Sequence, residues 1–239
     1  RSIYQKLKSI TQILDFNRIH ISISLLSDPD TEEEIHVSPS NANSPFLDRR
    51  LQKWFKAKAQ TTFPDCPSGF SIPEIDFNVI YILQHCYHHL LFDGLGIRQL
   101  MDYYFVLLKF RAEVEADQEH GCARVAAIQQ DLQYLGLLKF AGAMMWTLSE
   151  VFVMDPQYYI CEPDKKEGEF LLKEIMNGGV FGCFGNDQLM KSYQKGRTAF
   201  FLARMKRSLR FLFHYPGEIL WSPYYMISHY LWKRRINTI

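Results

Sequence analysis

The stretch of residues 74–110 constrains the fold most, because it reads as two helices joined at the glycines of residues 94–96. Its first half has an apolar stripe at helical spacing, formed by Ile80, Leu83, Tyr87 and Leu90. The opposite side carries a second row at positions i, i+3, i+4 and i+7, formed by His85, His88, His89 and Phe92. Neither side is expected to face water, so this helix should lie in the middle of a folded domain.

The second half of this stretch has its own stripe, formed by Leu100, Tyr103, Tyr104, Leu107 and Leu108. Arg98 and Asp102 lie four positions apart near its start, close enough to form an ion pair within the helix. The alternative places Arg98 at the mouth of a cleft as a phosphate ligand, because a guanidinium group matches phosphate oxygens.

The spacing of His85 and His89 could chelate zinc, but a third ligand and the H-E-x-x-H pattern are missing. Structural or hydrogen-bonding histidines are therefore favoured at these positions.

The composition is that of a folded protein without a membrane span. Of the 239 residues 47% are hydrophobic and 15% aromatic, enough to build a large core. No apolar run approaches the roughly 18 residues of a membrane-spanning helix, and the chain opens without a signal-peptide pattern. The five cysteines are widely spaced without a C-x-x-C pair, which favours the reducing cytoplasm over a disulfide-bonded framework.

Residues 1–60 combine helical and strand patterns. We expect a helix over 2–14, a strand over 18–24 where isoleucine alternates with polar residues, a turn over 27–31 and a second strand over 32–37. A Ser-, Pro- and Asn-rich loop follows, then a helix over 47–59 and a linker over 61–73 with three prolines. These elements amount to the end of an α/β unit, too small for an independent sheet.

Residues 74–239 read as helices only. Gly and Pro breaks separate the expected helices 75–92, 96–117, 121–134, 137–153, 164–177, 186–213 and 216–235. The predicted fold class is therefore α+β, mostly α, with an all-helical domain over 74–239.

Charge is distributed unevenly along the chain. Residues 188–239 hold 10 of the 27 Lys and Arg but only one of the 26 Asp and Glu, a net of +9, which leaves −8 for the first 187 residues. The basic side chains are interleaved with aromatic ones, so they could contact triphosphate or nucleic-acid phosphates. The favoured interpretation is that these basic side chains form the solvated face of an amphipathic core helix, because nothing here resembles an RNA-binding module.

Four segments in the same order resemble the uncharacterised nucleotidyltransferase family, within the DNA-polymerase-β-like nucleotidyltransferase superfamily. They are EEIHVSPSNANSPFLDRRLQKWF (33–55), HCYHHLLFDGLGIRQLMDYYFVL (85–107), EPDKKEGEFLLKEIMNGGVFG (162–182) and YPGEILWSP (215–223). The resemblance implies that residues 1–60 are the C-terminal part of a nucleotidyltransferase α/β unit and that a helical domain closes over its cleft.

In that superfamily a Gly-Ser turn and an Asp-x-Asp pair act with a third carboxylate on a later strand to hold Mg²⁺. By resemblance Glu34 occupies the position of this third carboxylate, with His36 next on the same strand face. No Gly-Ser and acid-x-acid segment precedes Glu34, and Asp28-Pro29-Asp30 is expected to lie in a turn, which is unsuited to the metal pair. The chain is therefore either a fragment or a member that has lost the pair, and by itself it is not expected to be a complete catalyst.

The function expected from the resemblance is transfer of a nucleoside monophosphate from a nucleotide triphosphate to an unknown acceptor, with Mg²⁺. Glu34 would act at the metal, and His36, His89, Arg98 and Asp102 are weaker candidates for phosphate or acceptor binding. The alternative is a non-catalytic helical binding or scaffold protein derived from the same fold. We expect the protein to be cytoplasmic. Nucleic acid is not the favoured partner, and the sequence does not specify an oligomeric state.

Overall fold

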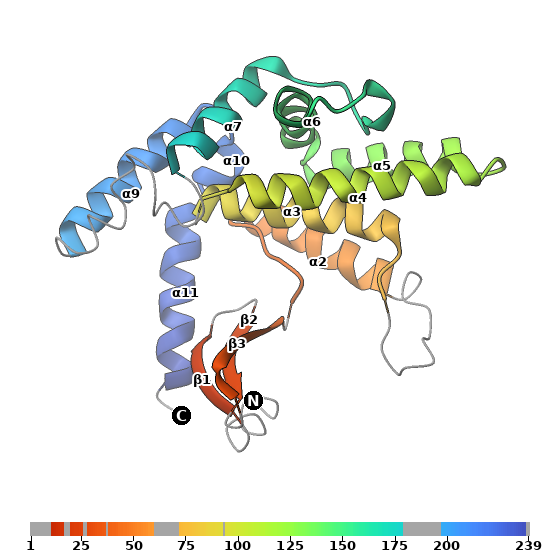
Figure 1. Ribbon diagram of the computed structural model, residues 1–239. Coiled ribbons are helices and arrows are strands. Elements are labelled where there is room, and N and C mark those ends of the chain that lie inside the picture. Colours follow the sequence, from red (N-terminus) through yellow and green to blue (C-terminus); the bar gives the residue numbers. More distant parts are fainter. Residues whose placement is uncertain are drawn as a thin grey trace.

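The computed structural model describes residues 11–16, 20–25, 28–36, 38–59, 72–92, 94–178 and 197–237, and for the strands it describes the backbone. The protein is mostly helical, as predicted, with one small sheet at the N-terminal side. In Figure 1 the sheet lies apart from the main body of helices, and the last helix, α11, extends from that body toward it.

The sheet has three antiparallel strands in the order β1-β2-β3, namely β1 Thr11–Phe16, β2 His20–Leu25 and β3 Asp28–His36. Backbone pairing joins Ser22 to Glu34 and His20 to His36. The two strands predicted from alternation are thus confirmed, with the second one beginning earlier than expected.

Two predictions in this region are wrong. The helix expected over 2–14 is strand β1 from Thr11 onward, and its earlier residues lie outside the described part. Backbone pairing of β1 with β2, where Ile13 lies opposite Ile23, explains the difference, because the hydrogen bonds between strands outweigh a short helical spacing pattern. Asp28 to Thr31 were expected in a turn but form the start of β3, with Asp28 paired to Leu25.

The helices largely follow the prediction. They are α2 Pro45–Ala59, α3 Ile75–Phe92, α4 Ile97–Ala116, α5 Gly121–Leu135, α6 Leu138–Phe152, the short 3₁₀ helix η1 Pro156–Tyr158, α7 Lys165–Gly178, α9 Arg197–Leu212, α10 Pro216–Ile219 and α11 Ser222–Asn237. The single helix expected over 216–235 is in fact two, since Pro223 suits only the first turn of a new helix. The linker prediction falls mostly on residues 60–71, and the first 11 of the 28 residues of the helix predicted over 186–213 are 186–196, both outside the described ranges.

Helices α3 and α4 form the centre of the core (Figure 1). The stripe predicted on α3 is buried, with Ile80 and Leu83 0% exposed, and on α4 Leu100 and Leu107 are also 0% exposed. The turn between the two helices passes through Gly94 at φ 98°, a left-handed conformation that favours glycine. The central helix pair is therefore confirmed.

Arg124 of α5 ties three helices together. Its guanidinium group donates to both carboxylate oxygens of Asp76 on α3, at 2.6 and 3.1 Å, and to Glu113 on α4 at 3.3 Å. These hydrogen bonds, Asp76 first, raise the pKa of Arg124 above its usual range, so the charge is fixed. The contacts set the angle at which α5 packs on the central pair.

Gly168 allows α7 to pack closely on α6. A Cβ at this position would lie 2.3 Å from Cε3 of Trp146. We expect Gly168→Ala to lower the free energy of unfolding by about 2 kcal/mol, because the indole of Trp146 would have to move within a packed layer. Denaturant unfolding measures this.

The matched control is Gly217→Ala in α10, where an added Cβ would meet nothing within 4 Å. It should stay within about 1 kcal/mol of wild type. Equal losses at the two positions would show that α6 and α7 do not pack as described.

No helix among the described residues is both long enough and apolar enough to cross a membrane.

Candidate functional site

The structure describes only the backbone of Glu34 and His36, the two strand residues predicted to lie near the metal. Glu34 and His36 lie in the last third of β3, two positions apart. Their side chains are outside the described part of the chain, so their roles stay predictions. Within that part, no three His, Cys, Asp or Glu side chains come together as a metal site requires.

The histidine row on α3 is half-buried, as predicted. His89 and His85 approach each other with their Nε2 atoms 3.0 Å apart, and their rings meet edge to face. The ring of His88 packs on Phe92, which in turn contacts Tyr225 of α11. The row therefore joins α3 to the C-terminal helix, which agrees with the structural interpretation of these histidines.

Arg98 and Asp102 do not form the expected pair. Both side chains are exposed on α4, and no ion pair joins them within the described structure, whereas Arg111 and Glu115 of the same helix are 2.9 Å apart. Holding two long side chains in one geometry at the surface gains little free energy, which accounts for the open arrangement. Neither residue lines the polar pocket described below.

Part of the basic C-terminal region has structural roles. Arg207, 9% exposed, donates hydrogen bonds to the carbonyl oxygens of Leu90 at 2.6 Å and Phe92 at 3.1 Å, the last residues of α3. A cation at a helix C-terminus satisfies carbonyls that have no partner within the helix. Arg210 pairs with Glu174 at 3.1 Å. These two arginines therefore make contacts within the helical domain.

A polar pocket of about 340 Å³ lies where the loop after β3 meets α11. We call residues 38–44 the SN loop. The pocket is lined by Ser38, Asn41, Ala42, Asn43, Pro45, Asp48, Gln52, Tyr224, Tyr225 and Ser228. Its lining is rich in hydroxyl and amide groups and includes one carboxylate but no Lys or Arg.

The SN loop is held in shape by the first turns of α2. The carboxylate of Asp48 accepts the backbone N–H of Ala42 at 3.2 Å, and the amide of Gln52 donates to the carbonyl of Ser40 at 2.8 Å. Gln52 also donates to Asp48 at 3.2 Å, which links the two contacts. Side chains one turn apart on α2 thus satisfy loop backbone groups that would otherwise need water.

Two contacts join the SN loop to residues near the end of the chain. The Asn41 side chain donates to the Tyr225 hydroxyl at 2.8 Å, across 184 positions, and Gln84 of α3 donates to the Asn41 carbonyl at 3.4 Å. The backbone N–H of Asn43 donates to the carboxyl of Glu218 at 2.6 Å. The SN loop is therefore in contact with α3, α10 and α11.

Glu218 is a buried carboxyl group, 3% exposed. Burial raises its pKa to about 7, although the backbone N–H groups of Asn43 and Ser44 favour the charged form, and nearby Asp48 raises it further. The anchor of the SN loop is thus an acid that titrates near neutral pH.

Several polar atoms of the SN loop lack a protein partner. The Oγ of Ser40 and the Oδ1 atoms of Asn41 and Asn43 are buried and accept no hydrogen bond from any described residue. Asn43 is 3% exposed and lines the pocket. A buried acceptor without a partner costs roughly 1–3 kcal/mol.

The sequence pattern pointed only partly to this pocket. The Ser- and Asn-rich composition of residues 38–44 marked a loop, and the same composition could have marked a hydrogen-bonding site. The contribution of Tyr225 and Glu218 had no local signal, because their contacts with the loop are long-range. The aromatic residues of α11, expected in the core or on a docking face, are half-buried or exposed.

Comparison of the chain with protein-family models, with curated proteins and with solved structures finds no match.

Proposed function

We propose that this protein is a nucleotidyltransferase and that its polar pocket binds the hydroxyl-bearing acceptor. The observation that carries the proposal is the pocket itself, which brings amide side chains, one carboxylate and two tyrosine side chains together beside the loop that follows β3. The resemblance of the segments around Glu34 and His89 supports the reaction class.

The chemistry of the pocket favours a neutral polyol over a phosphate. Its lining offers amide, hydroxyl and carboxylate groups, and no cation that could pair with phosphate charge. Tyr224, 54% exposed, adds an aromatic face on which a sugar or similar ring can pack. A sugar or nucleoside-like acceptor therefore fits this site better than the triphosphate does.

The position of the pocket in the chain agrees with this division of roles. Ser38 is four residues beyond Glu34, and four extended residues span at most about 14 Å. An acceptor in the pocket would thus lie close to the strand on which the resemblance places the metal-side carboxylate.

In the proposed reaction an acceptor oxygen forms a bond to the α-phosphorus of the nucleotide triphosphate. The bond between that phosphorus and the bridging oxygen breaks, and pyrophosphate leaves. Mg²⁺, held in part by Glu34, would neutralise the charge that develops on the phosphate oxygens. The proton of the acceptor hydroxyl must go to a base, and His36 is the candidate that the strand position offers.

The acceptor site is tested by Asn43→Ala. Removing the amide of Asn43, which lines the pocket, should weaken binding of a sugar or nucleoside about tenfold, because one hydrogen bond to the ligand is lost. Stability should be unchanged or rise by about 1 kcal/mol, because the buried Oδ1 atom has no partner among the described residues to lose. Saturation-transfer NMR against a panel of monosaccharides and nucleosides measures binding, and thermal unfolding measures stability.

Asn177→Ala, at an exposed position on α7, is the matched control and should change neither quantity. A variant that loses stability but keeps ligand affinity would show that Asn43 has a structural role only. No binding of any panel member to wild type would reject the acceptor site.

The second candidate is a non-catalytic helical binding protein derived from the same fold. The observation that favours it is an apolar groove between α9 and α11, far more suited to a protein segment than to a nucleotide.

A further inference from the structure

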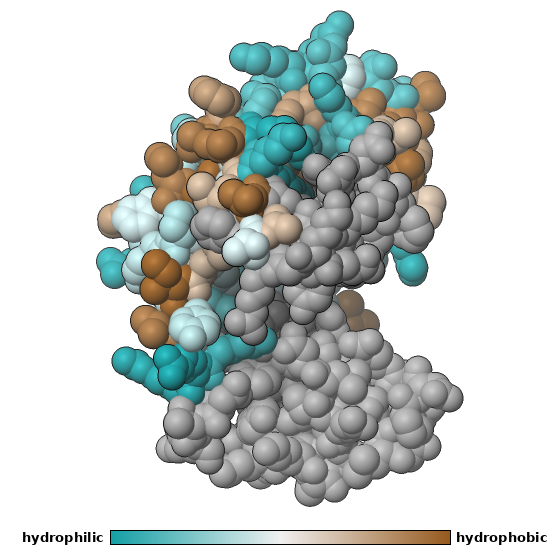
Figure 2. Space-filling model, turned by 90° about the vertical axis from the view of Figure 1, so that its left-hand side faces the viewer, coloured by the Kyte–Doolittle hydropathy of each residue, from teal (hydrophilic) through white to brown (hydrophobic). Residues whose placement is uncertain are grey.

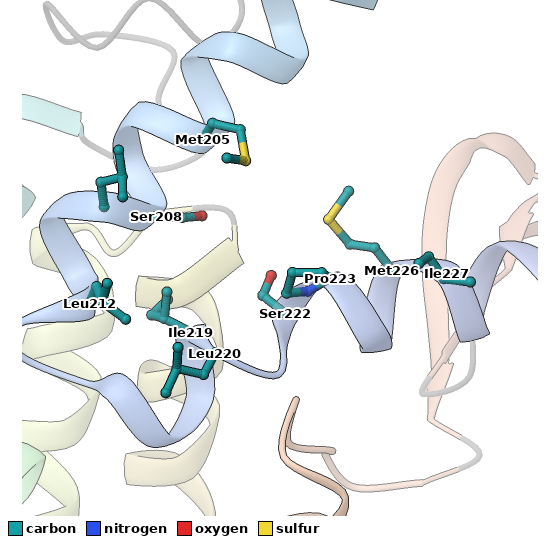
Figure 3. A pocket seen from close by; sticks show the side chains of 10 residues that line it. Met205, Ser208, Leu212, Ile219, Leu220, Ser222, Pro223, Met226 and Ile227 are labelled. Atoms are coloured by element: carbon teal, nitrogen blue, oxygen red, sulfur yellow. The ribbon is translucent and has the colours of Figure 1, made fainter.

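Helices α9 and α11 are separated by an open groove of about 510 Å³. Its walls are formed by Met205, Leu209 and Leu212 of α9 and by Leu220, Met226 and Ile227 from the chain after it. Figure 3 shows these side chains arriving from both sides, with the thioethers of Met205 and Met226 extending into the space between the helices. Flexible, polarizable methionine side chains suit a surface that adapts to an apolar partner.

The apolar lining of α11 continues along the same helix face toward its C-terminal end. Ile227 and Leu231 are four positions apart, 62% and 51% exposed, and Arg235 follows four positions later. Residues at this spacing lie above one another on a helix. The apolar stripe of α11 thus ends in a cationic group on the same face.

Helix α9 repeats the pattern. Leu202, Met205 and Leu209 are 66%, 46% and 58% exposed and fall at i, i+3 and i+7, with the exposed Lys206 four positions after Leu202. Figure 2 shows the side of the molecule on which α9 and α11 lie, where several hydrophobic residues reach the surface with hydrophilic ones beside them.

The exposed charged side chains of α9 and α11 among the described residues are cations, namely Lys206, Arg234 and Arg235. The acid between the two helices, Glu218, is buried. An occupant must therefore combine apolar side chains for the groove with negative charge for its rim. A concave groove between two helices receives an inserted side-chain row, as in helix-in-groove recognition, whereas a flat bilayer would leave its floor uncovered.

We propose that this groove binds an amphipathic helical segment of another protein whose flanks are acidic. Such a segment would insert a row of leucine-like side chains between α9 and α11 and place carboxylates near Lys206 and Arg235. This function is separate from the polar pocket and goes beyond nucleotidyl transfer.

The test uses three synthetic helical peptides with the full chain, followed by fluorescence anisotropy. The first has a leucine stripe and glutamate elsewhere, the second has the same stripe with lysine elsewhere, and the third keeps glutamate but has serine in the stripe. We expect the first to bind at least about tenfold more tightly than the other two, because affinity needs both the apolar row and charge complementarity.

Met205→Asp in the groove should weaken the first peptide about tenfold or more, since it places a carboxylate among apolar side chains. Met101→Asp on α4 is the matched control, because Met101 is 43% exposed, against 46% for Met205, and lies outside the groove. The double variant Lys206→Glu with Arg235→Glu should bind the first peptide several-fold more weakly than wild type does. Added salt should weaken this binding less than it weakens binding by wild type.

Three results would overturn the proposal. Equal binding of the lysine and glutamate peptides would remove the role of charge. Binding to phosphatidylserine vesicles without binding to the first peptide would assign the face to a membrane surface. Self-association of the chain that Met205→Asp abolishes, seen by sedimentation equilibrium, would assign the groove to a second copy.

Discussion

Between pH 5 and pH 8 the wild-type chain should lose roughly 2 to 3 kcal/mol of unfolding free energy relative to Glu218→Gln. In the folded protein, burial raises the pKa of Glu218 from 4.5 to about 7. The folded state therefore holds this proton more tightly than the unfolded state, and the resulting stability is present at low pH and lost as pH rises through about 7. Glutamine cannot ionise, but it can still accept the N–H of Asn43.

Denaturant unfolding at a series of pH values measures this difference, with Glu218→Ala as the companion variant. Alanine also lacks the charge, so it should share the flatter pH profile of glutamine. It lacks the acceptor as well, so it should be less stable than Glu218→Gln at every pH by about 1–3 kcal/mol, the cost of leaving a buried N–H without a partner. Parallel pH profiles for wild type and Glu218→Gln would contradict the buried anchor.

The second large effect is expected at Glu34. Glu34→Gln should lower Mg²⁺-dependent nucleotidyl transfer on the order of a hundredfold or more, because an amide is a poor ligand for a hard cation. Glu33→Gln is the matched control, because it makes the same chemical change one position earlier in β3. Transfer is followed as pyrophosphate release.

Loss of activity in Glu34→Gln with unchanged thermal stability would support the metal-side role. Equal losses in both variants would instead indicate that the strand carboxylates act only through general charge.

The helical part of the fold was predictable because its signals are local. The stripe of Ile80 and Leu83 and the break at Gly94 each lie within one or two helical turns, and both are confirmed. Strand β1 was missed because its pairing partner, Ile23 for Ile13, decides its conformation. The break between α10 and α11 was missed although Pro223 marks it.

The candidate site was much less predictable. The residues predicted from the sequence were charged or titratable ones such as Arg98 and Asp102, which are exposed and do not pair with each other in the described structure. The pocket instead depends on small polar residues of the SN loop and on Glu218, which reaches Asn43 across 175 positions. Such a contact is set by the packing of the whole helical domain, and no local spacing encodes it.

The most direct test of the central claim is pyrophosphate release by the full-length protein, with each nucleotide triphosphate and a mixture of sugar and nucleoside acceptors. The account predicts release that requires Mg²⁺ and an acceptor, with the KM for the acceptor raised about tenfold in Asn43→Ala and the KM for the nucleotide unchanged. Absence of release with every triphosphate, together with no thermal stabilisation by any of them, would contradict it.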